Sequence, residues 1–198
     1  MSLLSDRQIR EYAHAGMITP FEPGSVSLAA DGFEAGVKKV ISFGTGSYGY
    51  DARLGDEFML FQPYPGAVID PKNLNPNLFL RFLGPAYVDL PPHSYMLGHT
   101  VETFNMPNDV TGICLGKSTY ARCGLLINTT PLEAGWVGTV TLEIANLTPC
   151  PIRVYANEGI CQVVFLRGEE PCIHTYATKN AGNPSKYQGQ SGVTLAKA

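Results

Sequence analysis

The sequence predicts a mainly β protein of jelly-roll or barrel type with one short helix near its N-terminus. Only 16% of its 198 residues are charged, whereas 21 glycines and 15 prolines are spread along the whole length. Between these turn-forming residues lie short runs that are rich in β-branched and aromatic side chains. Many short strands with so little helix favour a closed or double-sheet β architecture. We find no internal repeat and no linker, so residues 1–198 are expected to form one domain.

The short helix is the first element that the sequence predicts. Ser5 and Gln8 have the spacing of a capping box, in which two side chains satisfy free backbone N–H groups at a helix start. The stretch from Asp6 to Ala15 can form the helix, and Gly16 can end it. We expect it to be the longest helix of the chain.

The predicted strands follow after a passage that is rich in Gly and Pro. In the first half, four runs predict strands: KKVISF, YDARLGDEFMLF, LFLRFL and AYVDL. In the second half, five more runs do so: VTGICLG, GLLIN, GTVTLEIAN, PIRVYA and GICQVVFL. The chain ends in the polar, Gly-rich stretch KNAGNPSKYQGQSGVTLAKA, which is typical of a loop or tail.

Charge and hydropathy exclude several classes of protein. A formal net charge of −3 gives no general basic surface for DNA or RNA. No run approaches the roughly 20 apolar residues that span a bilayer, and the start MSLLSDRQIR lacks the apolar segment of a signal peptide. We therefore expect a cytoplasmic protein that binds neither nucleic acid nor a membrane. The five cysteines contain no CxxC pair and are expected to be reduced thiols that pack as small hydrophobic residues.

Two motifs are similar to phosphate-binding loops. GTGSYG at Gly44–Gly49 matches GxGxxG, but the residues after it continue a strand pattern, so we interpret it as a turn between strands. GICLGKS at Gly112–Ser118 is one residue too short for a P-loop. The stretch GKSTYARCG nevertheless places cationic and hydroxyl side chains together. If STYAR forms a helical turn, its free N–H groups would face an anion; the alternative is a capped, solvated turn.

A carboxylate lies on the strand face that points away from the predicted core in GTVTLEIAN. Val140, Leu142 and Ile144 share one face, which leaves Glu143 on the other. A solvent-facing carboxylate on a half-buried sheet is one interpretation. The anion-binding candidate GKSTYARCG and the turn NTTPLEAGW lie just upstream, and this arrangement favours a functional one.

Several segments closely resemble the dCTP deaminase family: GKSTYARCG, PLEAGWVGTVTLEIAN and the terminal KYQGQSG. LSDRQI, SYGYDARLGDEF and EGICQVVF are similar to other recurring segments of that family and occur in its order, so the resemblance covers nearly the whole chain. It implies a dUTPase-like distorted jelly-roll or β-barrel fold, which the family shares with trimeric dUTPases. It also implies a homotrimer with active sites between subunits, which hydrolyses dCTP to dUTP and ammonia in pyrimidine deoxynucleotide biosynthesis. Feedback inhibition by dTTP would accompany that role.

The resemblance assigns catalytic and phosphate-binding roles to individual residues. It implies that Glu143 is the general acid and base, with Ser118 and Arg122 beside the attacking water and the pyrimidine. Lys117, Ser118, Thr119 and Arg122 would also meet the triphosphate, whose Mg²⁺ arrives with the nucleotide.

The resemblance also implies sugar-binding and tail residues. Glu133 falls where the family holds the sugar 3′-hydroxyl, and Trp136 would buttress the pocket from the neighbouring turn. Tyr176, Lys186 and Gln190 match residues of a tail, here residues 170–198, that closes over the nucleotide. Without the resemblance, the same tail would be interpreted as a frayed terminus.

The chain departs from the family pattern in three places. Lys117 and Thr119 stand where some members have Arg and Ser, and the segment Asn128–Gly135 is shorter than in one branch. The backbone of that segment is expected to contact the water and the base. The carbonyl that does so is Thr129, Thr130 or neither, and the sequence leaves this choice open.

The predicted chemistry uses no metal site of the protein. Many nucleobase deaminases generate hydroxide on zinc held by an HxE and PCxxC signature. This chain lacks that signature, and its histidines are scattered: His14, His93, His99 and His174. We therefore expect Glu143 to deprotonate the water and return the proton, a contribution of roughly 10²- to 10⁴-fold. Ser118 and a backbone carbonyl would orient that water, and Arg122 would favour the ionised carboxylate.

Three other functions remain open at this point. The nearest are a dUTPase and a bifunctional enzyme that deaminates dCTP and then releases pyrophosphate to form dUMP. A dUTPase uses an Asp-activated water and a Gly-Ser-Thr-Gly type of tail, whereas this chain has Glu133 in the turn and GQSGV in the tail. A non-catalytic nucleotide-binding module would also explain the fold and the anion-binding candidate.

Overall fold

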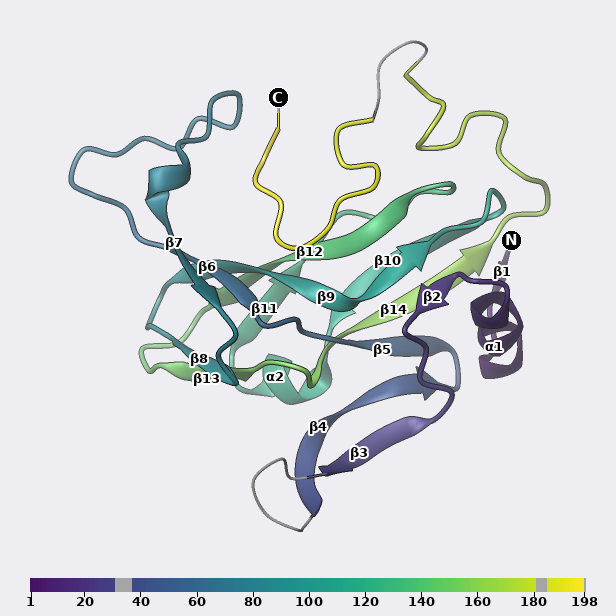
Figure 1. Cartoon of the computed structure of the whole chain (residues 1–198), viewed down its shortest axis with the longest axis horizontal. Helices are drawn as coiled ribbons and strands as arrows, with labels where there is room; N and C mark the ends of the chain where they lie inside the picture. Colours follow the sequence, from purple (N-terminus) through teal and green to yellow (C-terminus); the bar gives the residue numbers. More distant parts are fainter. Residues whose placement is uncertain (31–36, 181–184, 198) are drawn as a thin grey trace.

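The structure, a computed structural model, describes residues 1–30, 37–180 and 185–197, which form two packed β-sheets and few helices (Figure 1). The first sheet contains β1 (Ser2–Leu3), β14 (Gly159–Arg167), β5 (Gly49–Arg53), β4 (Val37–Gly46) and β3 (Ser25–Ala30) in this order, with β10 (Val110–Gly116) also paired to β14. The second sheet contains β11 (Leu125–Asn128), β12 (Val137–Asn146), β9 (Tyr95–Asn105), β6 (Glu57–Phe61) and β7 (Phe79–Leu83), with β2 (Ile18–Thr19) paired to β9. A separate ribbon pairs β13 (Ile152–Tyr155) with β8 (Tyr87–Leu90).

The helical elements are short. The predicted N-terminal helix is confirmed as α1 (Asp6–His14), and the Ser5 backbone N–H donates to the Gln8 side chain at 3.1 Å in a capping box. It is the longest helix of the described residues; the others are α2 (Ser118–Arg122) and the 3₁₀ turn η1 (Pro76–Leu78). None of these helices is long and apolar enough to cross a membrane.

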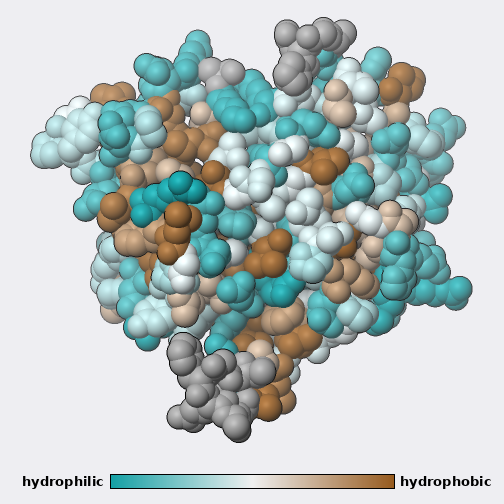
Figure 2. All heavy atoms as spheres, viewed as in Figure 1, coloured by the Kyte–Doolittle hydropathy of each residue, from teal (hydrophilic) through white to brown (hydrophobic). Residues whose placement is uncertain are grey.

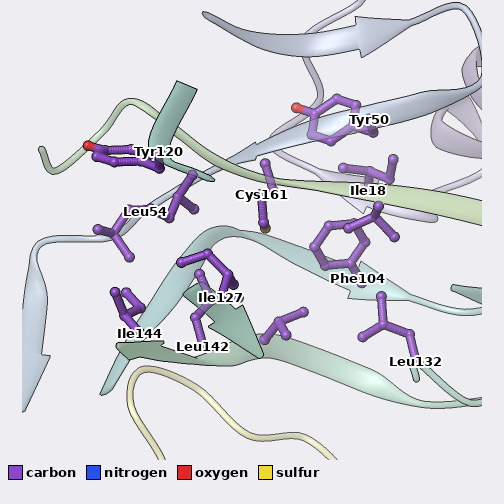
Figure 3. Packing of buried hydrophobic residues seen from close by; sticks show 14 of the residues in the cluster. Ile18, Tyr50, Leu54, Phe104, Tyr120, Ile127, Leu132, Leu142, Ile144 and Cys161 are labelled. Atoms are coloured by element: carbon purple, nitrogen blue, oxygen red, sulfur yellow. The ribbon is translucent and has the colours of Figure 1, made fainter. Parts of the chain in front are cut away.

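The hydrophobic core lies between the two sheets. Figure 3 shows Tyr50 and Cys161 from the first sheet facing Phe104, Leu142 and Ile144 from the second, and all five side chains are fully buried. At roughly 25 cal/mol per Å² of apolar area removed from water, this contact is the main source of stability. On the face shown in Figure 2, hydrophobic and hydrophilic residues are interspersed.

Several strands differ from those that the sequence predicts, and β1, β2 and β3 were not predicted at all. The run YDARLGDEFMLF is not one strand, because β5 pairs within the first sheet and β6 within the second. The chain crosses between the sheets at Leu54, which is fully buried and forms an isolated bridge to Thr100. The long strand β9 was not predicted, because Met96, Leu97 and Gly98 are buried in succession and give no alternation.

Some of the remaining local predictions are confirmed, and one is partly wrong. GTGSYG forms the turn between β4 and β5, as predicted, with Gly46 paired to Gly49. STYAR forms the short helix α2, which is the condition on which its interpretation as an anion-binding turn depends. The five cysteines are free thiols, but the prediction that they pack as hydrophobic residues is wrong for Cys123, Cys150 and Cys172, which are exposed.

Candidate functional site

A cavity of about 270 Å³ opens over the second sheet, between β12, the turn from 129 to 136 and the C-terminal tail. Its wall on the sheet side is apolar and aromatic, with Phe79, Tyr95 and Leu97. Glu143 is the acidic group on its floor, and Glu133 lies in the turn. The cavity therefore combines a carboxylate with a largely apolar surface, an arrangement that suits a small planar ligand with a few polar atoms.

Strand alternation places Glu143 in this cavity. Its neighbours Leu142 and Ile144 are fully buried in the core, so the Glu143 side chain points to the opposite face, as predicted. Leu97 on β9 and Asn128 on β11 lie directly across from it in the sheet. Burial raises the pKa of Glu143 to about 7, against a lowering contribution from its own backbone N–H. A carboxyl group with a pKa near neutrality can both accept and donate a proton.

The aromatic wall contains residues that the sequence analysis missed. Tyr95 lies next but one to Leu97 on β9, and its ring packs edge-on against Phe61 and Phe79 at centroid distances of 6.2 and 6.5 Å. Burial, together with the charge of Glu143, raises the pKa of Tyr95 to about 12, which keeps its hydroxyl protonated. Tyr95 could have been found only by predicting β9.

The turn between β11 and β12 forms the second wall. Trp136 is buried and lines the cavity, and its indole N–H donates to the Tyr187 carbonyl of the tail at 2.9 Å. Thr130 lines the cavity. The neighbouring Thr129 hydroxyl is buried and has no hydrogen-bond partner among the described residues.

The tail lies along β12, as the yellow trace in Figure 1 shows, and Gln190 forms an isolated bridge with Gly138. The Gly189 N–H donates to the Val137 carbonyl at 2.8 Å, and the Gln190 side chain donates to the Thr139 carbonyl at 2.7 Å. Tyr176, Tyr187 and Gln190 thereby become part of the cavity wall. Tyr187 was not predicted as a site residue. The predicted tail residue Lys186 is exposed and lies outside the cavity lining.

The predicted site residues in and next to α2 lie outside this cavity. Ser118, Thr119 and Arg122 are exposed, and none of them lines the cavity around Glu143. Lys117 is buried, and its ammonium forms an ion pair with Asp51 of β5. One chain therefore brings together Glu143, Thr130, Glu133, Trp136, Tyr176 and Gln190, but not Lys117, Ser118, Thr119, Arg122 or Lys186.

Over residues 1–30, 37–180 and 185–197, no three His, Cys, Asp or Glu side chains come together as possible ligands of a metal ion.

Comparisons with known proteins show which family the chain is similar to. A family model described as "dCTP deaminase-like" matches residues 3–168. The dCTP deaminase of Chromobacterium violaceum is 50% identical over 198 residues, and the match covers 100% of both chains. The dCTP deaminase of Bordetella pertussis is 49% identical over 197 residues, again with 100% of both chains covered.

A solved structure shows the same type of fold. The 2′-deoxycytidine 5′-triphosphate deaminase of Agrobacterium tumefaciens matches with a TM-score of 0.57 at 18% identity. The match covers 84% of this chain and 48% of that chain, so the protein described here spans about half of its length. The predicted mainly β fold is confirmed, and it is of the same type as that of this deaminase.

Proposed function

The chain belongs to the dCTP deaminase-like family, and from that premise we propose that it hydrolyses dCTP to dUTP and ammonia. Full-length relatives at about 50% identity that are named dCTP deaminase support this substrate. The reaction breaks the bond between C4 of the pyrimidine and its amino group, so the enzyme is a hydrolase of a cyclic amidine. Its product would enter the synthesis of pyrimidine deoxynucleotides, and we expect the enzyme in the cytoplasm, where this substrate is found.

The position of Glu143 in the cavity and its raised pKa support the proposal most directly. Water must lose a proton as it attacks C4, and ammonia must gain one as it leaves. A single carboxyl group can perform both transfers if its pKa lies close to the working pH, as that of Glu143 does at about 7. Because the sequence carries no HxE and PCxxC signature, we propose that this carboxylate activates the water without zinc.

The nucleotide would occupy the cavity with its sugar at the turn and its base at Glu143. In this arrangement Glu133 holds the 3′-hydroxyl, Trp136 supports the pocket, and Tyr176 and Gln190 close over the ligand. A carbonyl of Thr129 or Thr130 would orient the attacking water from the same turn. The triphosphate, which brings its own Mg²⁺, needs cations that this cavity does not supply from the described residues of one chain.

We propose that a second copy of the chain supplies these cations. In a homotrimer, α2 of one subunit would place Ser118, Thr119 and Arg122 at the cavity of its neighbour. Exposed apolar side chains near α2 support such a contact: Ile113 and Leu115 on β10 and Leu126 on β11 are 41%, 53% and 50% exposed. The same proposal includes two further contacts to the phosphates, one from Lys186 of the tail and one from Lys117, which precedes α2.

One incubation tests the function. Purified protein with dCTP and Mg²⁺ is expected to release ammonia and dUTP in equal amounts, at a rate that dialysis against a zinc chelator does not change. Activity that is lost on dialysis and restored by zinc alone would refute the zinc-free reaction. The triphosphate contacts predict that dCMP is a poor substrate, and equal kcat/KM for dCMP and dCTP would refute them.

The same incubation separates the alternative functions. A bifunctional enzyme would yield dUMP and pyrophosphate from dCTP, and a dUTPase would yield them only from dUTP. A non-catalytic module would bind dCTP in calorimetry and release no ammonia. We further propose that dTTP inhibits the enzyme by occupying the same cavity, which a dTTP titration of the rate would test.

A further inference from the structure

The side chain of Lys179 lies between two residues of the proposed nucleotide site. Its ammonium is 2.5 Å from Oε1 of Glu133, with which it forms an ion pair. The same ammonium lies 4.3 Å from the centre of the Tyr176 ring, within the range of a cation–π contact. Lys179 therefore links the tail to the turn between β11 and β12.

A local turn directs Lys179 toward these partners. The N–H groups of Thr178 and Lys179 both donate to the Thr175 carbonyl, at 3.0 and 2.8 Å. The Thr175 N–H in turn donates to the Thr178 hydroxyl at 3.0 Å. This single turn brings Lys179 back over Tyr176, three residues earlier in the chain.

The turn itself is fastened to the segment that carries Glu133. The Tyr176 N–H donates to the Ala134 carbonyl at 2.8 Å. Gly135 has a φ of +76°, and a Cβ atom there would lie 2.5 Å from Cβ of Thr175, so the tail approaches the turn as closely as a glycine allows. These two contacts hold Lys179 beside Glu133, so the ion pair is not an isolated surface contact.

The geometry leaves one carboxylate oxygen of Glu133 for a ligand. Oε1 accepts from Lys179, whereas no described residue donates to Oε2. We propose that Lys179 is a positioning residue, which holds Glu133 so that its second oxygen meets the sugar 3′-hydroxyl, and that it thereby sets the preference for nucleotides with this group. The inference rests on the proposed function, because it takes Glu133 as the sugar-binding residue.

This role predicts a change in selectivity without a large change in stability. The side chains of Lys179 and Glu133 are 36% and 47% exposed, and ion pairs at such positions contribute little to folding. A carboxylate that loses its fixed position, however, forms a weaker hydrogen bond with the sugar. Nucleotides that lack the 3′-hydroxyl would not be affected by that loss.

The test compares dCTP with its 3′-deoxy analogue, 2′,3′-dideoxycytidine triphosphate. The wild type is expected to prefer dCTP in kcat/KM, and Glu133→Gln to lose most of that preference. Lys179→Met should reduce the ratio of the two kcat/KM values by about 3- to 10-fold, because a hydrogen bond is weakened but not removed. Lys179→Arg, which keeps the charge, should restore much of the ratio.

Lys197→Met is the matched control. Lys197 belongs to the same tail, and its ammonium also faces a tyrosine ring, that of Tyr187 at 5.9 Å, but it donates to the Lys186 carbonyl and not to an acid. Its variant should keep the wild-type ratio. An unchanged ratio in Lys179→Met would overturn the inference. An equal loss of kcat/KM on both nucleotides would also overturn it, because it would show that Lys179 only holds the tail in place.

The outcomes also separate this inference from the proposed function. If the wild type deaminates dCTP and Lys179→Met keeps the full preference, only the inference fails. If Glu133→Gln keeps the preference, the sugar-binding role of Glu133 fails and the inference with it. If the wild type releases no ammonia, calorimetric affinities of the same variants for the two nucleotides give the ratio instead, and a wild type that binds neither nucleotide refutes both.

Discussion

Glu143 lies on a strand whose other face is packed in the core, and this position determines its chemistry. Replacement by Gln keeps the size of the side chain and removes its ability to exchange a proton. We expect Glu143→Gln to lower kcat for ammonia release by about 10²- to 10⁴-fold, with little change in KM. Glu169→Gln is a suitable control, because Glu169 is 89% exposed and its one ion pair among the described residues is with the N-terminal ammonium. A Glu143→Gln variant with wild-type turnover would end the proposed mechanism.

The raised pKa of Glu143 also predicts a pH-dependent effect on stability. Burial raises its pKa from an ordinary 4.5 to about 7, so the folded protein is penalised when this carboxyl ionises. The penalty is absent below about pH 4.5, grows as the pH rises to about 7, and is constant above that. Gln carries no such penalty. The Tm of Glu143→Gln minus that of the wild type should therefore increase from pH 4.5 to 7, and a difference that falls over this range would contradict the assignment.

Sequence alone locates Glu143 but not its surroundings. Alternation of apolar residues in GTVTLEIAN is enough to turn this side chain away from the core. Tyr95, which lies within the influence of the same carboxylate, belongs to β9 and has no pattern that predicts a strand. Its proximity depends on strand pairing between segments about 50 residues apart, and such pairing is not encoded locally.

At the scale of elements, α2 is tied to the first sheet by a buried ion pair. The side chains of Lys117 and Asp51 are only 10% and 17% exposed, and Gln162 of β14 donates to the second oxygen of Asp51 at 3.1 Å. Lys117 immediately precedes α2, so this pair fixes where the helix starts. The helix could then present Ser118 and Arg122 in a constant orientation.

A double-mutant cycle tests this tie. Lys117→Met and Asp51→Asn should each lower the free energy of unfolding by about 3 kcal/mol, because each leaves a buried charge or amide without its partner. The double variant should lose less than the sum of the two, which chemical denaturation can measure. The exposed pair of Arg153 and Asp89, 47% exposed on each side, is the control: Arg153→Met should cost about 1 kcal/mol or less. Strictly additive losses at Lys117 and Asp51 would show that the pair does not act as a unit.

The elements that sequence predicts well are those with a clear start and end. The capping box at Ser5 and Gln8 gives the start of α1, and the glycines of GTGSYG give the turn between β4 and β5. By contrast, β5 and β6 read as one strand in the sequence, although the chain changes sheets at Leu54. The partner of a strand is a tertiary property, and a run of residues does not specify it.

At the scale of the whole molecule, the predicted site residues lie in two separate places in the described part of one chain. The cavity is lined by Glu143 and Glu133 and, on one side, by residues of the tail. The exposed Arg122 and its hydroxyl neighbours on α2 lie outside that cavity. The motifs of the sequence are close together along the chain, between residues 116 and 143, and for that reason the sequence does not reveal this separation.

Subunit mixing tests whether neighbouring copies reunite the two groups. Glu143→Gln and Arg122→Ala are each expected to be nearly inactive alone. In mixed trimers, half of the subunits supply an intact Glu143 and the other half an intact Arg122, so about a quarter of the sites should receive both and recover activity. The control mixes Glu143→Gln with the double variant Glu143→Gln, Arg122→Ala, a combination that contains no intact Glu143. Recovery in the first mixture and none in the second would require a site shared between subunits, whereas no recovery in a mixture shown to contain hybrid trimers would mean that Glu143 and Arg122 are not brought to one site from different subunits.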